Sequence, residues 1–134
     1  MANGQPDVLL SKADVDRVFS FNKKQWSEAA GQMMSPIWNV RVHEHDSGAE
    51  IIGFDPDSGI GLSVMPFFRD DSRPPDMVIV GNYFPFGTLP PMTDVLKREM
   101  EIVASKEIGA AYSLTVKYEV TDKFQVIEFL ITEL

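Results

Sequence analysis

The sequence predicts an α+β domain built on a twisted antiparallel sheet of about five or six strands. Apolar residues recur at helical spacing in two segments and alternate with polar residues in several shorter ones. Short turns connect the neighbouring strand-like segments, and connections of this kind join antiparallel strands. The predicted order is an N-terminal helix, four strands, a second helix and a closing β-hairpin. Residues 1–10 are expected to form a flexible leader, and residues 11–134 a single domain.

The first helix is expected over residues 12–33. Ser11 begins it, because the four residues from Ser11 to Asp14 approximate a capping box. Apolar residues then follow the spacing of one buried stripe. The polar Asn22 interrupts this stripe, and Ser35-Pro36 ends it.

Four strand-like segments follow, each bounded by turns rich in Gly, Pro or Asp. They cover residues 38–43, 50–54, 60–68 and 77–84. Pro66 places the end of the third segment at a sheet edge or at a bulge, because proline cannot donate a ladder hydrogen bond.

The second helix is expected from residue 92 or 93 to residue 106. The chain then closes with strands over 112–120 and 124–131, the clearest alternating pattern in the sequence. The last strand is apolar on both faces, so we expect it in the interior of the sheet.

Composition narrows the classes of function. The chain has no cysteine, which excludes a disulfide scaffold and a cysteine-ligated zinc site. Its net charge of −8 argues against binding to nucleic acid or to anionic membranes, and it permits a basic protein partner. No apolar run approaches the roughly 20 residues that span a bilayer, and no secretory signal is recognisable. The expected location is therefore the cytoplasm.

The usual groups of catalysis are scarce. The two histidines, His43 and His45, lie two apart on one strand face beside Arg41, and we expect them to be solvent-exposed rather than metal ligands. The sequence contains no nucleophile elbow and no phosphate-binding glycine loop. It therefore nominates no catalytic residue, no metal site and no cofactor.

Acidic residues are concentrated between Glu44 and Asp76. This segment contains eight acidic residues and two arginines, so it accounts for six of the eight excess negative charges. In a four-strand meander the first and third turns share one end of the sheet. That end is expected to dock a basic partner or to mimic nucleic-acid phosphate, although ordinary turn chemistry also places Asp in such loops. The acidic residues expected there are Asp46, Asp70, Asp71 and Asp76.

The connection over residues 82–92 is unusually apolar for a loop. Either it packs over the end of the core, or it forms an exposed groove or lid for a ligand or peptide. The side chains expected to contribute are Tyr83, Phe84, Phe86 and Leu89.

Together these features predict a non-enzymatic binding or accessory protein that acts through the acidic end, the apolar loop, or both. One alternative is a small apolar-ligand binder or enzyme with a pocket between sheet and helices. The pocket residues would be Trp26, Met33, Trp38, Met65, Phe84 and Met100. Another is a homodimer formed through an exposed strand or the aromatic patch.

The element order is loosely similar to that of bacterial secretion chaperones and some toxin-immunity proteins, but no motif is shared and the closing strand pair departs from the chaperone pattern.

Overall fold

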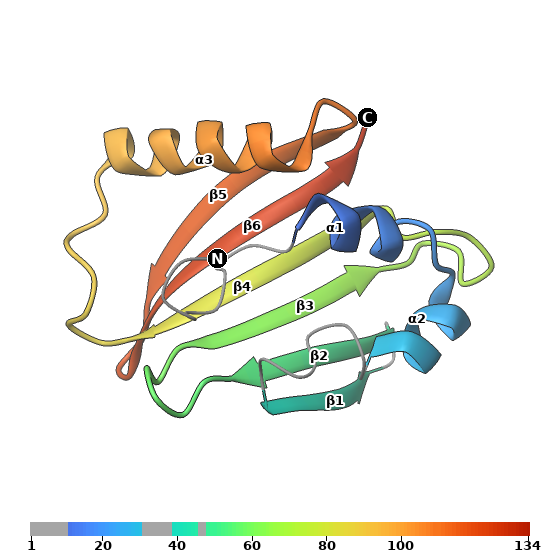
Figure 1. Cartoon of the computed structure of the whole chain (residues 1–134), viewed down its shortest axis with the longest axis horizontal. Coiled ribbons are helices and arrows are strands. Elements are labelled where there is room, and N and C mark those ends of the chain that lie inside the picture. The colour runs from blue at the N-terminus through green and yellow to red at the C-terminus, as the bar shows by residue number, and fades with distance from the viewer. Residues whose placement is uncertain (1–10, 31–38, 46–47) are drawn as a thin grey trace.

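The computed structural model describes residues 11–30, 39–45 and 48–134. It confirms the predicted α+β class, with one sheet and three helices in the described chain (Figure 1). The elements are α1 (Lys12–Val18), α2 (Lys23–Ala29), β1 (Asn39–His45), β2 (Gly48–Phe54), β3 (Gly61–Phe67), β4 (Met77–Pro85), α3 (Asp94–Ile108), β5 (Tyr112–Val120) and β6 (Phe124–Glu133).

The six strands form one antiparallel sheet in the order β1-β2-β3-β4-β6-β5. The first four strands make the expected meander. The last strand, β6, lies between β4 and β5, which confirms its predicted interior position. The ladder between β2 and β3 ends at Val64, so Pro66 is paired only with Val78 of β4 and no bond to β2 is lost.

The prediction of one helix over residues 12–33 is wrong. After Val18 the chain makes tight turns in which the amides of Ser20 and Phe21 donate to carbonyls three residues earlier. Asn22 then begins α2 with a full capping box: its side chain accepts from the Gln25 amide, and the Gln25 side chain accepts from the Asn22 amide, both at 2.9 Å. The polar residue that interrupts the apolar stripe is thus a helix start.

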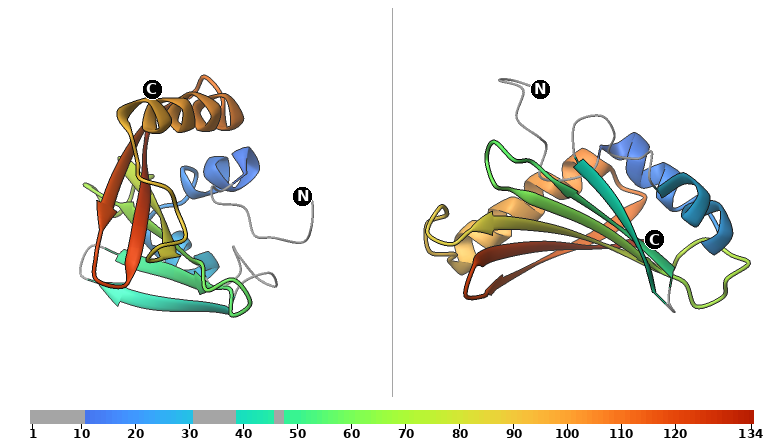
Figure 2. Two further views of the ribbon diagram at one scale, coloured as in Figure 1. Left: turned by 90° about the vertical axis from the view of Figure 1, so that its left-hand side faces the viewer. Right: turned by 90° about the horizontal axis from the view of Figure 1, so that it is seen from below.

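All three helices lie on one side of the sheet, which we call the helix-covered face (Figure 2). Trp26 of α2 is fully buried there, and its indole N–H donates to the Ala49 carbonyl at 2.6 Å. Phe19 contacts the ring of Tyr112 with 5.1 Å between centroids. One row of cross-strand partners forms the centre of this core: Ile51, Val64, Val80, Phe129 and Val116.

The helix α3 runs along β5, at one edge of the sheet (Figures 1 and 2). Thr93 caps its N-terminus, and Gly109 ends it with a φ of 92°, a conformation that favours glycine. The Glu101 carboxylate accepts a hydrogen bond from the backbone amide of Val116 at 3.1 Å. One outward-pointing amide of the β5 edge is therefore already bonded.

Candidate functional site

The face of the sheet opposite the helices is here called the open face, because no described helix packs on it (Figure 2). Cross-strand partners share a face, so the register identifies its residues. One row crosses all six strands and contains Arg41, Ile52, Ser63, Gly81, Glu128 and Lys117. The alternate residues of each strand complete the face.

The open face has an apolar centre and polar edges. On the four interior strands its apolar positions are Ile52, Phe54, Met65, Phe67, Met77, Ile79, Tyr83, Phe124, Val126 and Leu130. The described outward residues of the edge strands are all polar: Arg41 and His43 on β1, and Ser113, Thr115, Lys117 and Glu119 on β5. An antiparallel sheet with one solvated face usually shows polar residues on that face. This one carries polar residues on its edge strands and at Glu50, Ser63, Glu128 and Thr132 of the interior strands, and most of its other side chains are apolar.

A hollow of about 340 Å³ lies on the open face between Phe54 and Tyr83. Its lining includes Gly61, which presents no side chain, and it adjoins the strand pair that carries Gly81. A Cβ on Gly81 would lie 2.7 Å from the Ser63 hydroxyl oxygen and 3.2 Å from a ring carbon of Tyr83, so the tyrosine ring occupies the space above this glycine. The ring also meets Phe124 edge-on, with centroids 6.0 Å apart. Three aromatic residues, Phe54, Tyr83 and Phe124, thus line the hollow together with Ile52, Glu50, Ser63 and two glycines.

A second hollow, of about 350 Å³, adjoins the first and shares Ile52 and Phe54 with it. Its other lining residues are Arg41 and His43, both exposed on β1. The expected exposure of the histidine face therefore holds for His43. The side chain of His45 lies outside the described part of the structure.

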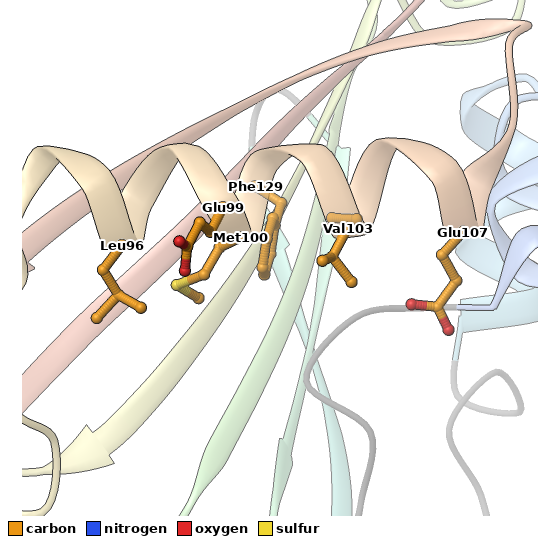
Figure 3. A pocket seen from close by; sticks show the side chains of 7 residues that line it. Leu96, Glu99, Met100, Val103, Glu107 and Phe129 are labelled. Carbon is orange, nitrogen blue, oxygen red and sulfur yellow. The ribbon is translucent and has the colours of Figure 1, made fainter.

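On the helix-covered face, an apolar groove of about 310 Å³ runs beneath α3 (Figure 3). We call it the α3 groove. Its lining residues are Leu96, Glu99, Met100, Val103, Ala104, Glu107 and Phe129. Met100 is half-buried against the core, whereas Val103 is 64 % exposed. Two glutamates thus border an otherwise apolar groove.

The predicted acidic residues that the structure describes lie in or next to the β3–β4 loop. Asp70 accepts from the amide and hydroxyl of Ser72 at 3.0 and 2.7 Å, and the Ser72 hydroxyl, followed by its amide, lowers the pKa of Asp70. Asp71 lies 3.7 Å from the Lys23 ammonium, and Asp76 accepts from the Arg69 amide at 2.9 Å. The contacts of Asp70 and Asp76 are ordinary turn chemistry, whereas the ion pair of Asp71 joins the loop to α2. Asp46, the fourth residue predicted for this end, lies outside the described residues.

The apolar loop after β4 is held by a residue that the sequence analysis did not identify, Gln125. Its side-chain oxygen accepts from the amides of Gly87 and Leu89, both at 3.0 Å, and its nitrogen donates to the Leu89 carbonyl at 3.1 Å and to the Tyr118 hydroxyl at 3.0 Å. Leu89 packs against the core, whereas Phe86 is 63 % exposed. The loop is therefore folded down, and a single aromatic residue projects from it.

The structure separates most residues that the sequence grouped. Tyr83 faces the open side and Phe84 the helix-covered side, since adjacent strand residues point in opposite directions. Of the predicted pocket residues, Trp26 is fully buried in the core, Met65 is on the open face and Met100 lines the α3 groove. Met33 and Trp38 lie outside the described residues.

The ionisable groups with shifted pKa values have local structural causes. A hydrogen bond from Ser58 lowers the pKa of Asp55 in the β2–β3 turn. Hydrogen bonds from Lys12 and Tyr112 lower the pKa of Asp16. Burial, followed by the hydrogen bond to Asp16, raises the pKa of Tyr112. Within the described residues, no three His, Asp or Glu side chains are grouped to hold a metal ion.

Comparisons with protein-family models, with curated proteins and with solved structures found no significant match to this chain. What defines it is therefore its own architecture: an α+β domain with a six-stranded sheet whose described helices all lie on one face. None of the described helices is long and apolar enough to span a membrane.

Proposed function

We propose that this chain is a non-catalytic protein-binding domain and that the open face is its contact surface. One observation carries the proposal: most outward side chains of the four interior strands are apolar, with Glu50, Ser63, Glu128 and Thr132 as the polar ones, and polar edge strands border them. Apolar patches rimmed by polar residues are typical of protein–protein contacts.

The physical argument rests on desolvation. Covering apolar surface contributes about 25 cal/mol per Å² removed from water, and the half-buried side chains of this face have not yet gained all of it. Aromatic residues are enriched among the residues that dominate binding energy, and Phe54, Tyr83 and Phe124 line the hollow at the end of the sheet where β2 ends and β3 and β6 begin. The polar margins keep water away from the centre once a partner is bound.

Affinity capture from an extract of the native cells tests the proposal, with the tagged wild-type chain and three variants as baits. Phe54→Glu changes a 45 % exposed residue of the open face, and Ile102→Glu changes a 49 % exposed residue of α3 as its matched control. The Asp70→Asn/Asp71→Asn double variant tests the acidic loop. We expect the wild type, the Ile102 control and the Asp variant to retain the same partner, and Phe54→Glu to lose it.

Thermal unfolding of each purified bait verifies that it is folded. A partner that Phe54→Glu still retains would contradict the open face as the contact surface. A partner lost only by the Asp70/Asp71 variant would place the contact on the β3–β4 loop instead.

A second candidate function is the binding of a small apolar ligand, and the α3 groove favours it. Its volume of about 310 Å³ is at the lower end of the range for ligand pockets, and Met100 can adapt to irregular ligands.

A thermal-shift screen of small apolar compounds tests this function. The matched pair of variants is Val103→Glu, in the groove and 64 % exposed, and Val95→Glu, outside it and 69 % exposed. We expect stabilising compounds to act on the wild type and on Val95→Glu only; a screen without hits would contradict this function.

A further inference from the structure

We infer that the partner of the open face is a second copy of this chain, bound face to face as a twofold-symmetric dimer. This inference rests on the proposed function, because it names the occupant of the same surface. Two properties of the face support it: its area and its charge.

The area matches that of a stable dimer contact. Six strands about 4.8 Å apart and seven to ten residues long, at about 3.3 Å per residue, give a face of roughly 24 Å by 23–33 Å. This is on the order of 600–700 Å² before side-chain relief is counted, close to the roughly 800 Å² per partner of a standard specific interface. Two such sheets can pack with their backbones about 10 Å apart and form an apolar layer between them.

The charge of the face suits a like-charged partner. Its described charged residues are Arg41, Lys117, Glu50, Glu119 and Glu128. Three acids and two bases leave a net charge of −1, whereas the whole chain carries −8. A basic protein would be attracted to the acidic remainder of the molecule rather than to this face. A second copy meets little repulsion here, because most of the negative charge lies elsewhere.

Sedimentation equilibrium of the purified wild-type chain over a range of concentrations tests the inference, together with methionine oxidation by dilute peroxide followed by mass spectrometry. Met65 and Met77 lie on the open face, whereas Met92 and Met100 lie on the helix side and act as internal controls; all four are half-buried. We expect a concentration-dependent dimer in which Met65 and Met77 oxidise more slowly as the dimer forms, while Met92 and Met100 keep their rates.

Two single variants test whether the open face forms the dimer contact. In Phe54→Glu a carboxylate would be buried against apolar surface, so we expect the dimer dissociation constant to rise by about tenfold or more. Ile102→Glu, with the same change of charge at a similarly exposed site on α3, should leave it unchanged. The oxidation measurement uses only wild-type protein and decides the question even if the Phe54 variant does not fold.

Two outcomes overturn the inference: a wild-type chain that stays monomeric at all concentrations, or a dimer in which Met65 and Met77 react as in the monomer. The proposed function fails separately. A monomeric chain that captures a different protein, lost in Phe54→Glu, overturns self-association and leaves protein binding by the open face intact. A monomeric chain that captures nothing overturns both.

Discussion

Asp16 connects α1 to the sheet through one carboxylate. Lys12, one helical turn earlier, donates to one oxygen at 2.8 Å, and the Tyr112 hydroxyl of β5 donates to the other. Tyr112 also packs on Phe19, so a polar and an aromatic contact join the same two elements. The hydrogen bond from Lys12, followed by that from Tyr112, lowers the pKa of Asp16. Burial, followed by the hydrogen bond to Asp16, raises the pKa of Tyr112.

These opposite shifts predict a stability contribution with two pH limits. The lowered pKa of Asp16 stabilises the fold fully above the ordinary value of 3.8, and this contribution is lost as the pH falls below that value through the lowered pKa. The raised pKa of Tyr112 stabilises the fold below the ordinary value of 10.0, and this contribution is lost as the pH rises beyond it. We expect Tyr112→Phe, which keeps the ring, to lower the urea midpoint most near neutral pH. Urea unfolding at acidic, neutral and alkaline pH measures this, and a difference independent of pH would contradict it.

At the residue scale, the sequence predicts side-chain direction better than it predicts distant partners. Strand alternation alone is enough to place Tyr83 and Phe84 on opposite faces, once β4 is known to extend to Pro85. The hydrogen bonds between Gln125 and the loop over residues 86–89 join positions 36 to 38 residues apart in the sequence, so no local sequence pattern predicts them. Whether the apolar loop is open or folded down was therefore decided by a contact that only the structure reveals.

At the scale of elements, α2 depends on the side chain at its start. A helix of seven residues has few internal hydrogen bonds, so the two bonds of the capping box are a large share of its local stabilisation. Asn22→Ala removes the bond to the Gln25 amide. We expect it to lower the free energy of unfolding by about 1 kcal/mol, as measured by urea denaturation.

Two matched variants control this experiment. Asn22→Asp keeps an acceptor of similar capping strength, and Lys24→Ala changes an exposed position within the same helix. Both should remain close to the wild type. A loss of stability in Lys24→Ala equal to that in Asn22→Ala would show that the cap is not the cause.

The strands were more predictable than the N-terminal helices, for a physical reason. The edge strand β5 buries one face against α3 and exposes the other to water, so its sequence alternates, and its predicted bounds are those in the structure. The apolar stripe of α1 continues in phase into α2, because both helices cover the same face. Periodicity therefore indicated one helix, and the Asn22 to Gln25 spacing was the signal that separated two.

At the scale of the whole molecule, charge and apolar surface are segregated. The open face carries −1 of the net −8, so the excess negative charge lies on other parts of the chain. This arrangement makes the salt dependence of the capture experiment informative. Retention through the apolar face should persist from low to moderate salt, since screening weakens only contacts between exposed charges. A partner released by moderate salt would instead point to the acidic loop.

The bond between Glu101 and the β5 amide affects how copies of the chain can join side by side. A bare edge strand is a template onto which further strands can be added without limit. Here the Glu101 carboxylate already bonds one outward-pointing amide of β5, and α3 runs beside that edge. A strand that adds along β5 has to break this bond, so among the described strands β1 is the less obstructed edge. We therefore expect lateral joining of copies to favour β1 over β5.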